Sequence, residues 1–209
     1  MSPTLPMTMR WLLLATLHPS RTVTLQLPTL NMRLTPGSKS PPIQLPGIDR
    51  TTFDTSSLEG KPYLLSFFRF ASCPFCNLRV NELVKRFDEF GEDFTIVAIF
   101  DSPLDNLAKH TEGHHAPFPI LADEKNVFYK MYGIERSFAG MMKGMIFRFG
   151  TLMKGMFKGY VPLIFKGSLI TMPADFLIDK DGIIQEAYYA KDEGDHLDFE
   201  RIKAFSKEA

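Results

Sequence analysis

Residues 69–80 read RFASCPFCNLRV and hold the two cysteines of the chain, Cys73 and Cys76, with two residues between them. The run before them, YLLSFFRF, is strongly apolar and predicts a buried central strand. After them, apolar residues recur at helical spacing as far as Phe87, with charged residues on the other side. The sequence therefore predicts that the CxxC pair lies where a buried strand turns into an amphipathic helix.

Strand and helix signals alternate along the rest of the chain. Two further apolar runs predict buried strands, and a short helical segment follows each of them: FTIVAIF (94–100) with SPLDNLAKHT (102–111), and FPILAD (118–123) with KNVFYKMYGI (125–134). Residues 174–190 predict a hairpin with KDG as its turn, and residues 195–208 predict a closing helix with Asp195 at its N-cap. We predict an α/β domain with a mixed central sheet covered by helices on both faces.

Composition limits the classes of function. The 209 residues carry 24 basic and 24 acidic side chains, and this zero net charge gives no support to nucleic-acid binding. Two cysteines are too few for the disulfide framework of a small secreted fold, so we expect them to have a chemical role. Residues 1–31 are rich in Pro and Thr and show no amphipathic period, so we predict a flexible extension before a domain at 32–209.

The apolar stretch Trp11–Leu17 resembles a minimal signal peptide, but no small-x-small cleavage site follows it. No apolar run approaches the ~18 residues that cross a bilayer. We therefore expect a cytoplasmic protein rather than a secreted one, with association to a membrane surface as an open alternative.

The position of the cysteines at the start of a helix has a chemical consequence. Unpaired N–H groups and the positive end of the helix dipole stabilise a thiolate there, which lowers the thiol pKa from about 8.5. Pro74 suits the first turn, where its missing N–H costs nothing. We expect Cys73 to lie at an exposed lip and attack a substrate, and Cys76, one turn further along, to resolve the mixed disulfide.

A zinc site and a structural disulfide fit the pair less well. His110 and His114 have the H-x3-H spacing of a zinc site, but they lie far downstream of Cys76, in what is predicted to be an exposed loop. A purely structural disulfide would close a very short loop and would constrain little chain entropy. We therefore favour a redox centre.

Four segments, taken in order, resemble peroxiredoxin-like proteins of the alkyl hydroperoxide reductase and thiol-specific antioxidant superfamily: GKPYLLSFFRFASCPFC (60–76), FTIVAIF (94–100), FPILADEKNVFYKMYGI (118–134) and MPADFLIDKDGII (172–184). The resemblance covers about residues 33–206 apart from an insertion, and it implies a thioredoxin fold. It also implies that Pro173 is a cis proline that faces the cysteines and shapes substrate access. It further implies a thioredoxin- or glutathione-type thiol reductant and a disulfide or peroxide substrate. No cofactor or metal is required.

The chain also departs from true peroxiredoxins. Their peroxidatic cysteine follows a threonine or serine by three residues; here Cys73 takes that position, so Cys76 matches the peroxidatic cysteine. Pro173 stands where a distant peroxide-holding arginine would fall. We therefore favour a thiol–disulfide oxidoreductase over a peroxidase with Cys76 peroxidatic and Cys73 resolving. A membrane-surface or scaffold protein with a non-catalytic or zinc-binding CxxC is a further alternative from another class.

Two more polar residues are candidates for the site. Arg69 ends an apolar strand, where a buried cation needs a partner. It could steady a thiolate or a peroxide oxygen, or it could pair with a carboxylate elsewhere, and the sequence leaves both open. His196 could carry protons, although a capped surface helix explains GDHLD (194–198) more simply.

The insertion, at about residues 137–170, is rich in methionine and locally basic, with no acidic residue from Ser137 to Ala174. A helix here would carry methionine and other large apolar residues on one face, and lysines with glycines on the other. The repeated glycines weaken the helix prediction. We expect the apolar face to pack on the domain or on a second subunit; docking to an adaptable partner or lying in a membrane interface are the alternatives.

Overall fold

The computed structural model describes residues 33–58, 60–160 and 167–208, so the predicted flexible extension at 1–31 lies outside the described residues. A central strand, β3 (Tyr63–Phe68), takes its place in a five-stranded sheet of order β5-β4-β3-β6-β7. Strands β4 (Thr95–Phe100) and β5 (Ile120–Ala122) run parallel to it. Strands β6 (Ala174–Ile178) and β7 (Ile184–Tyr189) form an antiparallel hairpin on its other side. The predicted mixed sheet is confirmed.

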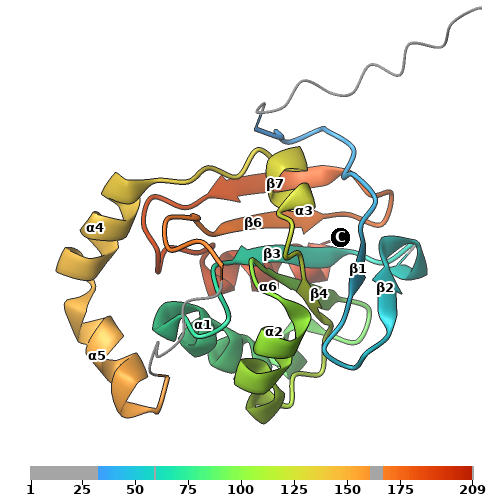
Figure 1. The fold of residues 1–209 in the computed structure, drawn as a ribbon. Coiled ribbons are helices and arrows are strands. Elements are labelled where there is room, and N and C mark those ends of the chain that lie inside the picture. Colours follow the sequence, from blue (N-terminus) through green and yellow to red (C-terminus); the bar gives the residue numbers. More distant parts are fainter. Residues whose placement is uncertain (1–32, 59, 161–166, 209) are drawn as a thin grey trace, which may run out of the picture.

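Both faces of the sheet are covered (Figure 1). Side chains of β3 alternate between two buried clusters, with Leu64 and Phe68 in one and Leu65 and Phe67 in the other. Helices α1 (Pro74–Lys85), α2 (Leu104–Thr111) and α6 (Phe199–Glu208) contribute to the first cluster. Helix α3 (Val127–Met131) and strand β1 (Gln44–Pro46), which pairs with β2 (Thr52–Asp54), contribute to the second. Three short 3-10 turns join these elements: η1 (Thr55–Leu58), η2 (Phe87–Phe90) and η3 (Glu112–His114).

The start of α6 differs from the prediction. The helix begins at Phe199, and the Asp198 carboxylate accepts the Glu200 N–H at 2.8 Å, as an N-cap does. Asp195, predicted as the cap, instead accepts the Lys191 N–H and the Tyr188 hydroxyl in the preceding loop. The prediction was wrong because both aspartates precede an apolar helical period, and only the loop geometry decides between them.

The insertion forms two helices, α4 (Phe138–Phe147) and α5 (Phe149–Phe157), which meet at Arg148. They stand at one edge of the domain, where α5 packs beside α1 (Figure 1). Ser137 caps α4 by accepting the Gly140 N–H at 3.0 Å. None of the described helices has both the length and the apolar character to cross a membrane.

The expectation that the apolar face of the insertion packs on its own domain was wrong for most of that face, although Leu152 packs against the first buried cluster and Tyr160 lies against His114. The glycine side faces the domain, and Gly140, Gly144 and Gly155 are buried against neighbours outside the insertion. Large apolar side chains point outward instead, with Phe147 79% and Phe157 84% exposed. Glycines lack side chains, so the helix backbones approach the domain closely on that side.

Candidate active site

The turn from β3 into α1 holds both cysteines. Cys73 is the N-cap of α1 and donates its N–H to the Phe70 carbonyl, and Pro74 opens the first turn as predicted. The Asn77 side-chain amide donates to the carbonyls of Ala71 at 2.7 Å and Cys73 at 2.9 Å. These bonds close the loop around the pair and fix the position of the helix start.

His114 supports this loop from η3. Its Nε2 lies 2.8 Å from Oδ1 of Asn77, whose amide nitrogen is already occupied, so His114 donates. Burial lowers the pKa of His114, which favours the neutral ring. His110 bonds instead to the Asn106 carbonyl of its own helix. The pair is therefore not arranged as zinc ligands, and His114 is buried rather than in an exposed loop.

Both cysteines are fully buried and not joined by a disulfide. The expectation that Cys73 lies at an exposed lip was wrong, because the insertion covers the start of α1. Gly155 of α5 lies over Pro74, and Gly144 of α4 lies against Glu193. The insertion, which looks unrelated to the cysteine pair in the sequence, therefore covers it in the structure.

Arg69 joins the cysteines to a buried carboxylate. One guanidinium nitrogen donates to Oε2 of Glu193 at 3.0 Å and lies 3.8 Å from Sγ of Cys73. A second guanidinium nitrogen donates to the carbonyl of Leu169, which lies at the C-terminal end of the insertion. The Arg69 backbone N–H also donates to Sγ of Cys76 at 3.4 Å. Both roles that the sequence left open for Arg69, thiolate contact and ion pair, are present together.

These contacts make the two thiols different. Burial raises the pKa of Cys73, but a hydrogen bond from Cys76, the charge of Arg69 and backbone N–H groups outweigh it and lower the pKa to about 6. Burial, together with the charge that Cys73 carries, raises the pKa of Cys76 well above its ordinary value. Cys73 is therefore the thiolate of the pair at neutral pH, and Cys76 is its protonated partner.

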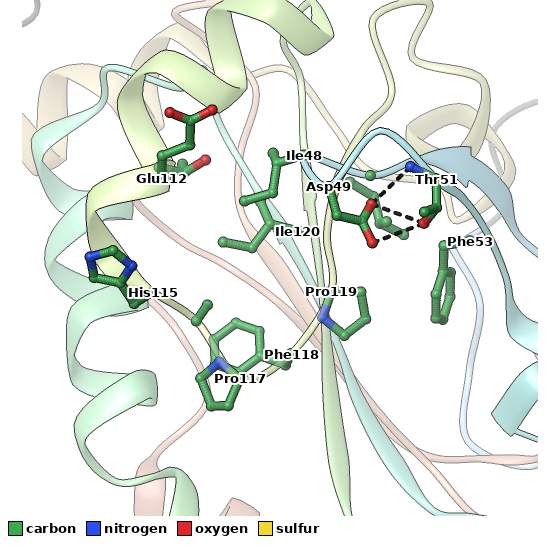
Figure 2. A pocket seen from close by; sticks show the side chains of 14 residues that line it. Ile48, Asp49, Thr51, Phe53, Glu112, His115, Pro117, Phe118, Pro119 and Ile120 are labelled. Atoms are coloured by element: carbon green, nitrogen blue, oxygen red, sulfur yellow. Dashed lines mark hydrogen bonds between the residues drawn. The ribbon is translucent and has the colours of Figure 1, made fainter.

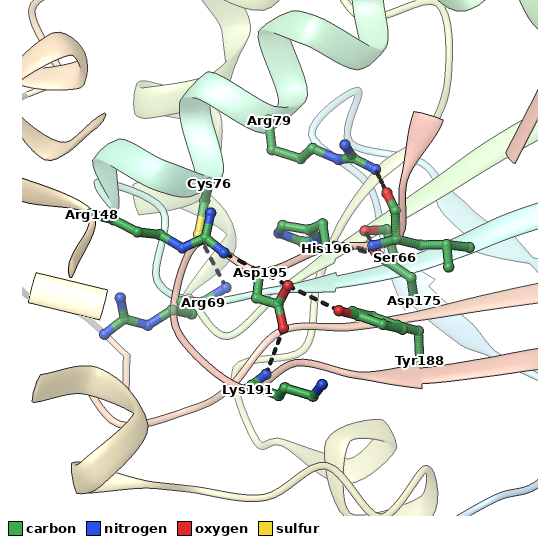
Figure 3. Close-up of polar contacts among 11 residues, drawn as sticks. Ser66, Arg69, Cys76, Arg79, Arg148, Asp175, Tyr188, Lys191, Asp195 and His196 are labelled. Atoms are coloured by element: carbon green, nitrogen blue, oxygen red, sulfur yellow. Dashed lines mark hydrogen bonds and ion pairs between the residues drawn. The ribbon is translucent and has the colours of Figure 1, made fainter. Parts of the chain in front are cut away.

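Glu193 is a site residue that the sequence did not reveal. It is 2% exposed in the loop between β7 and α6, and burial raises its pKa to about 7, although Arg69 lowers it. The neighbouring Asp192 accepts from Nε of Arg148 at 2.6 Å, which ties the insertion to the same loop. Figure 3 shows Arg148 directed toward Asp195 of this loop. No local motif marks a loop glutamate as buried, so only the tertiary structure identifies it.

Pro173 lies at the entrance of β6, and its carbonyl accepts the Ala190 N–H at 3.1 Å. The expectation of a cis proline was wrong, since the described residues contain no cis peptide bond. The nearby Thr171 donates to the buried Asp101 at 2.9 Å, and this bond holds the returning segment at the end of β4.

The side chain of His196 is buried against the sheet rather than on a helix surface, which corrects the simpler interpretation. Its Nδ1 lies 3.1 Å from the Asp175 carboxylate, which also accepts the Ser66 hydroxyl at 2.5 Å (Figure 3). Burial raises the pKa of Asp175, but His196, Arg79 and Ser66 together lower it below the ordinary value. The network anchors the loop before α6 to the central strands.

A surface cavity lies elsewhere, between the β1–β2 hairpin and the segment that leads into β5 (Figure 2). Its wall is largely apolar, with Phe53, Phe118 and Ile120, and Asp49 on its rim is already hydrogen-bonded to Thr51. Neither cysteine lines it, so it is separate from the thiol pair.

Comparison with known proteins decides the family. The sequence profile of the AhpC/TSA family matches residues 36–187, which is most of the chain. The chain belongs to the AhpC/TSA family. A protein of Mycobacterium tuberculosis strain H37Rv named as a peroxiredoxin is 25% identical over 122 residues, which are 56% of this chain and 78% of that protein. Family membership supports a thiol redox function, as the cysteine pair does.

Solved structures confirm the thioredoxin fold of this AhpC/TSA family member. A peroxidoxin, BcpB, from Mycobacterium tuberculosis aligns with a TM-score of 0.61 at 18% identity, covering 84% of this chain and 98% of that one. A thiol peroxidase from Chromobacterium violaceum aligns with a TM-score of 0.59 at 18% identity, covering 86% and 90%. At this level of identity the likeness establishes the fold.

Proposed function

We propose that the protein is a thiol–disulfide oxidoreductase that cycles Cys73 and Cys76 between dithiol and disulfide. The observation that carries the proposal is the asymmetry of the pair: Cys73 contacts Arg69 and has a pKa of about 6, whereas the pKa of Cys76 is raised. An attacking thiolate beside a protonated partner is the arrangement that two-step disulfide exchange needs.

In the first step the Cys73 thiolate attacks one sulfur of a substrate disulfide. A bond forms between Cys73 and that sulfur, and the other substrate sulfur leaves as a thiolate, which takes a proton from the Cys76 thiol. In the second step Cys76 attacks Cys73, the Cys73–Cys76 disulfide forms, and the second substrate thiolate leaves. Two electrons pass from the pair to the substrate, and an external thiol reductant of the thioredoxin or glutathione type returns them.

The burial of Cys73 adds a requirement. A disulfide substrate reaches its sulfur only when the contact of α5 with the start of α1 opens, because Gly155 covers Pro74. Arg69 keeps its charge near the pair throughout, since Glu193 and the Leu169 carbonyl hold its guanidinium.

A second candidate is a thiol-dependent peroxidase, supported by the family and by relatives named as peroxiredoxins. In that reaction a cysteine thiolate attacks a peroxide oxygen, the O–O bond breaks, and water or an alcohol leaves. The resulting sulfenic acid condenses with the other thiol to the disulfide and releases water. The raised pKa of Cys76 opposes its role as the peroxidatic residue and favours Cys73 as the attacking thiol here as well.

Stopped-flow oxidation of the reduced protein separates the candidates. We expect a protein disulfide to oxidise the pair rapidly and hydrogen peroxide to react at the rate of an ordinary thiol. Fast peroxide oxidation with slow disulfide exchange would replace the first candidate with the second. A pair unreactive toward both would leave the non-catalytic alternative, and metal release on chelation would show a zinc site.

A further inference from the structure

The outward side of the two insertion helices, here called the outer face, carries several large apolar side chains that are exposed. Among them, Phe147 and Phe157 are 79% and 84% exposed, and Ile146 is 64% exposed. The other exposed members on α4 and α5 are Phe138, Met142, Met145, Phe149 and Met156. An exposed apolar patch of this kind on a folded domain marks an interaction site.

The outer face is held outward by the opposite side of the same helices. Gly140 packs on Met172, Gly144 on Glu193 and Gly155 on Pro74, so the glycine side is already buried. Arg148, between the helices, bonds to Asp192 at 2.6 Å and so also faces the domain. Rotating the helices to bury their phenylalanines would break these contacts, so the outer face is part of the fold.

The charged residues of the insertion helices themselves are all basic. Lys143, Lys154 and Lys158 are exposed, and none has an ion-pair partner among the residues that the structure describes. Lys154 stands at the flank of α5, where it lines a pocket that Glu82, Asp195 and Asp198 also line. No acidic residue occurs between Ser137 and Ala174. The outer face therefore combines exposed apolar side chains with lysines that form no ion pair among the described residues.

We propose that the outer face docks on an anionic phospholipid membrane, with its apolar side chains in the interface and Lys143, Lys154 and Lys158 at the headgroups. Charge complementarity selects this occupant. A symmetric pairing of two copies through this face would bring the lysines of one copy against those of the other, which opposes a dimer. Exposed phenyl side chains suit a deformable lipid surface, into which they can insert.

The proposal does not depend on the thiol chemistry, and binding to vesicles tests it directly. The full-length protein is co-sedimented with vesicles of phosphatidylcholine containing phosphatidylglycerol, and with vesicles of phosphatidylcholine alone. We expect binding to the anionic vesicles, little binding to the neutral ones, and loss of binding as salt rises, because exposed charges are screened over ~10 Å at 0.1 M.

Two variants map the contact to the outer face. Lys143→Gln/Lys154→Gln/Lys158→Gln removes the charges, and we expect binding at low salt to weaken on the order of a hundredfold. Phe147→Ser/Phe157→Ser removes the two most exposed tips, and we expect a comparable loss. Both sets of side chains are exposed, so the fold should not depend on them.

Matched controls change the same residue classes elsewhere. Lys109→Gln/Lys125→Gln/Lys180→Gln removes three other exposed lysines, and Val127→Ser/Met131→Ser removes exposed apolar side chains from α3. Both should bind as the wild type does. The proposal is overturned by no binding to anionic vesicles, by equal binding to neutral ones, or by equal losses in the controls. Binding that survives both outer-face variants places the lipid contact elsewhere and also overturns it, as does a dimer abolished by Phe147→Ser/Phe157→Ser without vesicle binding.

Discussion

Gly155 of the insertion lies directly against Pro74, the residue that follows Cys73 and opens α1. A Cβ at position 155 would lie 2.8 Å from Cβ of Pro74 and 3.3 Å from its carbonyl oxygen, closer than such atoms approach without movement. The basic insertion and the thiol pair, separate features in the sequence, are therefore one structural unit. The close packing of α5 on the start of α1 keeps Cys73 away from solvent.

Enlarging Gly155 should uncover the pair. Gly155→Val cannot keep the present contact with Pro74 and Leu78, so α5 must move outward, and we expect overpacking to cost about 1–3 kcal/mol of stability. Alkylation of the native protein by iodoacetamide should then become several-fold faster. Gly150→Val is the matched control, because no atom lies within 4 Å of its Cβ position. Equal rates in both variants and the wild type would show that α5 does not limit access.

Arg69→Met should raise the pKa of Cys73. The substitution removes the charge that lies 3.8 Å from Sγ and keeps most of the bulk. In the wild type we expect the pH profile of alkylation to have its midpoint near the pKa of about 6. In the variant the midpoint should move toward the free value, with a fall in rate at neutral pH of roughly tenfold or more.

The control for this prediction is Arg201→Met, which breaks the ion pair with Glu186 away from the cysteines. It should leave the midpoint unchanged. An Arg69→Met protein that is folded by circular dichroism and has the wild-type midpoint would exclude Arg69 as a source of the lowered pKa.

Several parts of the fold follow from local patterns. The apolar run at β3, the KDG turn between β6 and β7, and Pro74 in the first turn of α1 each depend on residues close in sequence, and each prediction is confirmed. The cysteine pair and Arg69 stand out as candidates for the same reason: a CxxC at a strand end, and a charge ending an apolar run, are visible in the sequence itself.

The remainder depends on contacts distant in sequence. Amphipathic patterning predicts that the apolar face of a helix packs on the core. In α4 and α5 the glycine side packs on the domain instead. In a sequence, repeated glycines look the same whether they form such a contact or only weaken the helix. Glu193 joins Arg69 across 124 residues of chain. His196 looked like a surface residue because its partner, Asp175, lies on a strand distant in sequence. Hydrophobic periodicity carries no signal for polar pairs of this kind.

The two cysteines should behave differently when each is replaced. Cys76→Ser leaves the attacking thiol without its resolving partner, so reaction with a protein disulfide should accumulate a long-lived mixed disulfide through Cys73. Cys73→Ser should trap little, because the pKa of Cys76 is raised. Non-reducing electrophoresis after acid quenching reads the product. If Cys73→Ser instead traps substrate or consumes peroxide rapidly, Cys76 is the attacking residue and the peroxidase with Cys76 peroxidatic is supported.

Glu193 should make the stability of the fold fall as pH rises through the weakly acidic range. Its pKa rises from 4.5 to about 7 on folding, because burial disfavours the carboxylate. Between these values the folded state binds more protons than the unfolded state, so the free energy of unfolding decreases with pH. The loss amounts to at most about 3 kcal/mol at pH 7 and above. This loss of stability should be complete once the pH exceeds the pKa of Glu193 in the folded state.

Glu193→Gln tests this dependence, since glutamine keeps the size of the side chain and cannot ionise. The wild type should lose stability relative to the variant between pH 4.5 and 7 in urea unfolding followed by circular dichroism. Cys73 works in the opposite sense, since its lowered pKa stabilises the fold as pH rises above about 6. Because the charge of Cys73 also raises the pKa of Glu193, the two groups are linked, and the same comparison in a Cys73→Ser background separates the effect of Glu193. A difference that stays constant over this range would mean that Glu193 remains ionised beside Arg69, and the raised pKa would be excluded.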